Sequence, residues 1–154
     1  MSKAFTNEDT PTPDDADAVP PRERQMPITP AGLVRLQREL AELRRMNPSG
    51  PGEVGARRAR VLAQVLESVY VVEPSAPEGR AAFGARVIVE DDEGEITAYE
   101  LVGPDEVDLP ARRISSASPV GQALLGKRAG DRAVLRRPKG AVEVTVRSVT
   151  RPDE

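Results

Sequence analysis

The chain has 154 residues, of which 38% are hydrophobic and 31% charged, and its formal net charge is −3, which suits one small domain with an appended element. Because it contains no cysteine and no histidine, disulfide frameworks, thiolate or imidazole zinc sites, Cys or His nucleophiles and His general bases are excluded. Aromatic residues make up only 3%, which argues against binding single-stranded nucleic acid by base stacking.

Residues 1–27 are rich in proline and acidic side chains and contain few large apolar ones. Such a segment cannot bury enough apolar surface to offset the cost of ordering, so we expect a disordered acidic tail. It lacks the apolar stretch of a signal peptide, and no run in the chain approaches the roughly 20 apolar residues of a membrane span. The sequence therefore predicts a cytoplasmic protein with no membrane contact.

Residues 28–70 have the pattern of a short antiparallel helical hairpin. Thr29 is a good N-cap and Pro30 suits the first helical position. Leucines then recur every three or four residues, which indicates one apolar seam: Leu33, Leu36, Leu40 and Leu43. The helix is expected to end near Met46, before the turn sequence NPSGPG, and a second helix over residues 53–69 repeats the spacing, with Ala59, Leu62, Leu66 and Val69.

The hairpin is the basic part of the chain. Residues 26–70 contain seven arginines and four acidic residues, whereas the segments on either side are net negative. Five of these arginines gather near the predicted turn: Arg44, Arg45, Arg57, Arg58 and Arg60. They are compatible with an anionic partner such as a phosphate backbone, and equally with the solvated face of an amphipathic hairpin.

The rest of the chain predicts a small β-rich domain. Residues 71–82 are expected to form a short strand and a linker, and residues 83–150 a mainly antiparallel sheet. Ser118 and Pro119 fit the N-cap and first position of a short helix between strands. Acidic stretches at residues 90–95 and 103–108 are typical of turns. Together with the hairpin, these elements give an α+β fold.

Three stretches of sequence resemble bacterial Gre transcript-cleavage factors. They are PITPAGLVRLQRELAEL near the N-terminus, FGARVIVEDDEGEITAYELVGPDEVD, and ISSASPVGQALLGKRAGDRAVLRRPKGAVEVTV. The resemblance covers most of residues 26–149. It implies a coiled-coil hairpin followed by an FKBP-like C-terminal domain that binds RNA polymerase at its secondary channel.

The resemblance also suggests where polymerase binds. The Ser118–Pro119 loop matches the polymerase-binding loop of the family, and Asp105 and Glu106 are further candidates for this contact. The five hairpin arginines are candidates for contact with the channel wall or with RNA or DNA phosphates. We expect a monomer with no catalytic residue, metal site or cofactor of its own.

The chain departs from the family at the tip of the hairpin. Gre factors carry an acidic signature of the type D-x-x-E-N, which helps to hold a catalytic metal in the polymerase, whereas Glu53 is the only acidic residue here between positions 43 and 66. Holding a divalent cation usually takes more than one carboxylate. The sequence therefore predicts a non-enzymatic polymerase regulator without cleavage activity. A GreB-type cleavage factor and a regulator of a nucleotide-metabolising enzyme are the alternatives.

Overall fold

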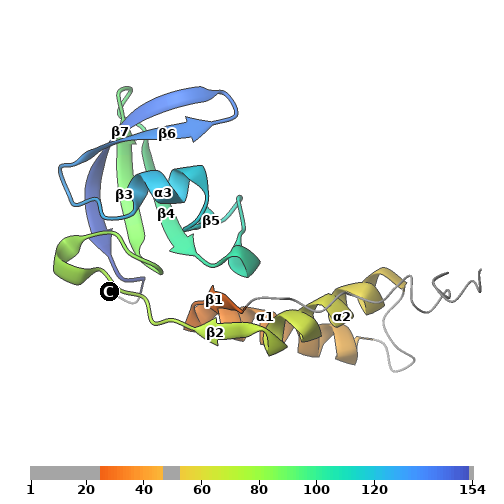
Figure 1. The fold of residues 1–154 in the computed structure, drawn as a ribbon. Coiled ribbons are helices and arrows are strands. Elements are labelled where there is room, and N and C mark those ends of the chain that lie inside the picture. The colour runs from red at the N-terminus through yellow and green to blue at the C-terminus, as the bar shows by residue number, and fades with distance from the viewer. Residues whose placement is uncertain (1–24, 47–52, 153–154) are drawn as a thin grey trace, which may run out of the picture.

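The computed structural model describes residues 25–46 and 53–152. Two helices, α1 (Pro30–Arg45) and α2 (Glu53–Glu67), lie side by side as a hairpin that extends from one end of a five-stranded sheet (Figure 1). The expected α+β class is confirmed. The predicted turn at residues 47–52 and most of the predicted tail lie outside the described residues.

Helix α1 begins and ends as its sequence predicts. The Thr29 side chain accepts a hydrogen bond from the Gly32 amide at 3.0 Å, and Pro30 occupies the first helical position. Met46 is the C-cap residue. The cap satisfies an amide that has no partner within the first turn, and this fixes where the helix starts.

The hairpin has its own small apolar core. Its buried members are Ile28, Leu36, Leu40, Leu62 and Val65, with Leu33, Leu43, Ala59 and Leu66 packed around them. The predicted seam on α1 is therefore correct. On α2 the buried residues are Leu62 and Val65, and Leu66 packs against them as a partly buried residue.

The ends of the hairpin differ from the prediction at two places. Strand β1 (Met26–Ile28) pairs in parallel with β2 (Val69–Val71), so residues 26 and 27 are not part of a tail. Helix α2 ends at Glu67, two residues early, because Val69 enters this pairing. This two-stranded sheet at the base of the helical hairpin thus places Met26 opposite Val69.

The sheet of the C-terminal domain has the strand order β5-β4-β3-β7-β6. Strands β3 (Arg86–Asp91) and β4 (Ile96–Val102) form the hairpin predicted around the acidic turn. Strands β6 (Arg132–Arg137) and β7 (Gly140–Thr150) form the last hairpin. The short β5 (Arg113–Ser115) runs parallel to β4, and all the other neighbours are antiparallel.

Alternation along the strands buries one face of the sheet. Val87, Val89, Leu101, Leu135 and Val146 are at most 1% exposed, and Leu124 of helix α3 (Pro119–Leu124) joins them. Ala81 also belongs to this core, and its backbone pairs with Gly126 and Lys127. The last residues of the predicted 71–82 linker are therefore built into the domain rather than separating it from the hairpin.

Candidate functional site

Glu106, a predicted docking residue, is buried between the hairpin and the sheet domain. Its side chain is 0% exposed and ends the 3-10 turn η4 (Pro104–Glu106). The carboxylate accepts hydrogen bonds from the amides of Thr29 and Gly103, both at 3.0 Å, and from the Thr29 hydroxyl. The Arg35 Nη2 atom lies 3.5 Å from the Glu106 Oε1 atom. This corrects the expectation that Glu106 offers an exposed contact to polymerase, because its oxygens are already used inside the molecule.

Two glycines permit close packing here, Gly32 against this carboxylate and Gly103 against the Pro27 backbone. A Cβ atom on Gly32 would lie 1.8 Å from the Glu106 Oε1 atom, and one on Gly103 would lie 1.9 Å from the Pro27 carbonyl oxygen. The negative charge thus sits against the first turn of α1, where the helix dipole favours an anion. A glycine in the first turn and the pattern Gly103-Pro-Asp-Glu106 are the sequence signals of this contact, which sequence reasoning missed.

The Ser118–Pro119 loop is tightly braced from within. The Ser118 hydroxyl accepts from the Gly121 amide at 3.1 Å and donates to the Ser115 carbonyl at 2.6 Å. Gly121 has no room for a side chain, because its Cβ would lie 2.2 Å from that same carbonyl oxygen. Pro119 is exposed at the first position of α3. The loop therefore presents Pro119 on a fixed backbone, as the cap pattern predicted.

The parallel pairing of β4 with β5 brings the two predicted docking segments to one edge of the sheet. Val102 pairs with Ser115, and the Ser116 amide donates to the Val102 carbonyl at 2.9 Å. The η4 turn follows one strand and the Ser118–Pro119 loop follows the other. In the segment directly after η4, Leu109 is 70% exposed and Val107 44% exposed. Exposed apolar side chains that gather on one surface are typical of a protein-binding site, and sequence reasoning missed these two.

A groove of about 510 Å³ runs between the hairpin and the segment that follows η4. Its lining includes Leu36, Asp105, Leu109, Arg58 and Arg113. Arg58 crosses from α2 to bind Glu39 of α1 through two hydrogen bonds, of 2.7 and 3.2 Å. Hydrogen bonding to Glu39 raises the pKa of Arg58 above its usual value. Arg113 is paired with Asp108 at 2.9 Å. Arg58 thus links the two helices.

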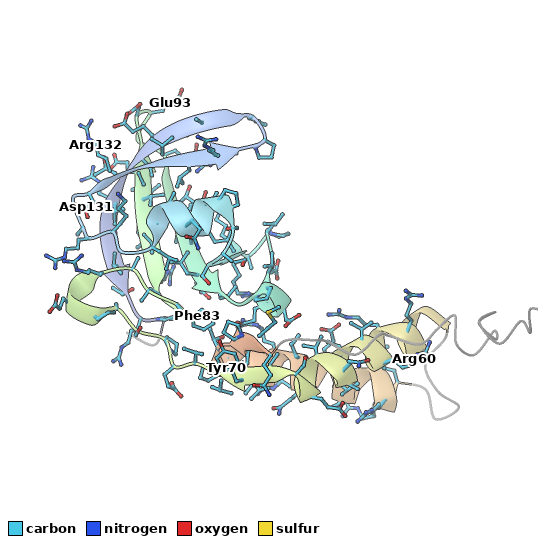
Figure 2. The ribbon with its side chains drawn as sticks, in the orientation of Figure 1. Arg60, Tyr70, Phe83, Glu93, Asp131 and Arg132 are labelled. Atoms are coloured by element: carbon cyan, nitrogen blue, oxygen red, sulfur yellow. The ribbon has the colours of Figure 1, made fainter. Side chains whose placement is uncertain are left out.

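The other predicted arginines line the far part of the hairpin. Arg44, Arg45, Arg57 and Arg60 are all exposed. Arg45 pairs with Glu42 at 2.7 Å, a surface contact that contributes little to stability. Figure 2 shows Arg60 on the hairpin, well away from the sheet domain. Arg60 therefore projects away from the sheet domain, at the part of the hairpin farthest from it.

Residues 25–46 and 53–152 contain no group of three or more acidic side chains placed to hold a metal ion. No helix in these ranges is both long and apolar enough to span a membrane.

Comparison with known proteins identifies the family. Residues 76–151 match the family model described as "Transcription elongation factor, GreA/GreB, C-term". The transcription elongation factor GreB of Pseudomonas aeruginosa is 36% identical over 148 residues, and the match covers 79% of this chain and 88% of that protein. The chain belongs to the GreA/GreB family.

Two GreA proteins agree with this assignment. GreA of Rhodospirillum rubrum is 34% identical and is covered over 96% of its length. GreA of Syntrophobacter fumaroxidans is 45% identical over 91 residues, so the match spans just over half of each protein, 58% in both cases. Among solved structures, the GreA factor homolog 1 (Gfh1) of Thermus thermophilus is 26% identical, with 82% of this chain and 99% of that chain covered and a TM-score of 0.45.

Replacing Glu106 tests its part in this GreA/GreB-family fold. Glu106→Ala leaves the buried Thr29 and Gly103 amides without their acceptor, and each loss costs about 1–3 kcal/mol. We expect the free energy of unfolding, measured by urea denaturation, to fall by at least about 2 kcal/mol, with faster hydrogen exchange at both amides. Asp92→Asn, in the exposed β3–β4 turn, is the control and should change little. Equal stability of the two variants would show that the Glu106 contacts contribute nothing.

Proposed function

We propose that this chain regulates transcription by binding RNA polymerase at the secondary channel, without stimulating transcript cleavage. Membership of the GreA/GreB family supports the polymerase as partner. The C-terminal domain docks on the enzyme, and the hairpin projects from it into or toward the channel. A factor in this position alters elongation, pausing or initiation, or competes with cleavage factors for the same site.

The observation that carries the non-cleaving proposal is the charge of the hairpin. Between residues 43 and 66 the sequence has one acidic residue, Glu53, and five arginines. Recruiting a divalent cation to phosphoryl-transfer chemistry needs several converging oxygen ligands. Guanidinium groups repel a cation and bind phosphate or carboxylate instead. A hairpin of this composition favours an anionic surface over a metal ion.

The docking surface we propose is the edge that carries the Ser118–Pro119 loop and Asp105. Its apolar members are Pro119, Val107 and Leu109, and its backbone is held by the β4–β5 pairing. Protein interfaces combine an apolar centre with a polar rim, which this edge provides. Glu106 contributes indirectly, because it closes the turn that presents Asp105.

A cleavage assay on a stalled, backtracked elongation complex tests the proposed function. We expect the protein to bind the complex in a pull-down and to leave the transcript length unchanged at stoichiometric amounts. A GreB protein from the family is the positive control. Metal-dependent shortening of the transcript would instead establish the alternative, a GreB-type cleavage factor. Failure to retain polymerase would favour a different protein partner, such as a nucleotide-metabolising enzyme.

The docking surface is tested by Pro119→Ala. Alanine, a good helix former, is accommodated at this exposed first helical position, so folding should change little. Removal of the ring from the proposed interface should weaken polymerase binding. Pro77→Ala alters another exposed proline at the first position of a 3-10 turn and is the matched control. Equal polymerase affinities of the two folded variants would remove Pro119 from the interface.

The hairpin arginines are tested by neutralising Arg44, Arg57 and Arg60 together to glutamine. Arg58 is left in place because its contact with Glu39 joins the helices. We expect the variant to bind polymerase through the C-terminal domain and to lose its effect on transcription, since the anionic contact is gone. Neutralising Arg80, Arg86 and Arg128 of the C-terminal domain makes the same charge change elsewhere. Full transcriptional activity of the hairpin variant would show that its arginines form only a solvated face.

A further inference from the structure

The turn between β6 and β7 carries a second concentration of positive charge, separate from the hairpin. From Arg132 to Val142 the chain contains four cationic residues and no acidic one. Arg136, Pro138 and Lys139 are exposed. The next acidic residue, Glu143, is already paired with Arg132 at 3.1 Å, farther back along the strand. The end of the β-hairpin is therefore left with uncompensated positive charge.

The four cations have different roles. Arg137 turns toward the domain, where its Nη2 atom donates a hydrogen bond of 2.9 Å to the hydroxyl of the buried Tyr99. Arg136 and Lys139 form no ion pair with any residue of the described ranges. Tyr99 thus anchors the last residue of β6, and Gly140 with a φ of 122° allows the tight return into β7. A fixed backbone presents the two unpaired cations.

The surroundings of these cations favour a phosphate backbone over an acidic protein surface. A protein interface normally has an apolar core, whereas residues 136–140 offer only Pro138. Binding to phosphodiesters depends on cation contacts and the release of counterions, and it needs little apolar area. Arg136 supplies a fork that can bind a phosphate through two hydrogen bonds, and Lys139 supplies a point charge.

We propose that the β6–β7 turn is a nucleic-acid contact, in which Arg136 and Lys139 bind the phosphodiester backbone of RNA or DNA. This goes beyond the proposed function, because it uses neither the hairpin arginines nor the Ser118–Pro119 edge. In Figure 1 the β6–β7 turn and the helical hairpin extend toward the same side of the molecule. Strand β5, at the docking edge, lies on that same side between them, so the turn contacts nucleic acid independently of the hairpin.

The test is a titration of the full chain with a labelled single-stranded RNA and, separately, a labelled DNA duplex, followed by fluorescence anisotropy over a series of salt concentrations. The variant is Arg136→Gln with Lys139→Gln. Its matched control is Arg80→Gln with Arg128→Gln, which removes the same charge from the part of the domain around the 3-10 turn Pro77–Gly79. Polymerase retention is measured for each protein in parallel.

We expect the wild-type chain to bind at low salt and the turn variant to bind more weakly. Loss of two phosphate contacts should reduce the slope of log affinity against log salt by about 1.4 for the single strand and about 1.8 for the duplex. The arm with the larger loss of affinity identifies RNA or DNA as the source of the phosphates. The control should match the wild type, and polymerase retention should be unchanged in both variants.

Four results would overturn the proposal. Wild-type affinity and slope in the turn variant would show that the turn touches no phosphate, as would the absence of any binding by the wild type at low salt. Equal losses in the two variants would show an effect of net charge alone. Loss of polymerase retention with unchanged nucleic-acid binding would assign the turn to an acidic protein surface. None of these results bears on whether the chain stimulates cleavage, so the proposed function is judged separately.

Discussion

One buried carboxylate connects the two parts of this molecule. Glu106 closes the η4 turn through the Gly103 amide, accepts hydrogen bonds from the amide and hydroxyl of Thr29, and faces Arg35. Thr29 in turn caps α1 through Gly32. A buried carboxylate is tolerated only when its oxygens accept hydrogen bonds or face a cation. The start of α1 and the end of β4 therefore have to meet at this point. The direction in which the hairpin leaves the domain follows from that meeting.

The single parallel pairing in the main sheet has a similar organising effect. If β5 ran antiparallel to β4, like the other neighbouring strands, the segments that follow the two strands would leave from opposite ends of the strand pair. Because they run in the same direction, the η4 turn and the Ser118–Pro119 loop emerge together. The structure thus gathers the hairpin anchor and the proposed docking edge in one region. The basic residues remain at positions that project from it.

Local signals predicted the local structure well. Caps with a following proline marked the starts of α1 and α3, and apolar spacing identified the buried side of α1. The contacts that set the arrangement in space join residues far apart in sequence, such as Thr29 with Glu106 or Met26 with Val69. A glutamate in an acidic turn has the sequence pattern of a surface residue, so the burial of Glu106 was missed although the nearby glycines signal a close contact. The exposure of Leu109 was missed for the converse reason, because leucine is more often buried than exposed.

The close fit around Gly32 and Gly103 limits how this protein can be recombined with its relatives. A hairpin transplanted onto another C-terminal domain keeps its orientation only if the recipient supplies a carboxylate at the position of Glu106 and a bare backbone at the position of Gly103. A donor hairpin with a side chain at the position of Gly32 would strike that carboxylate. Chimaeras of family members are therefore expected to keep the hairpin orientation when the first turn of α1 and residues 103–106 come from the same parent protein.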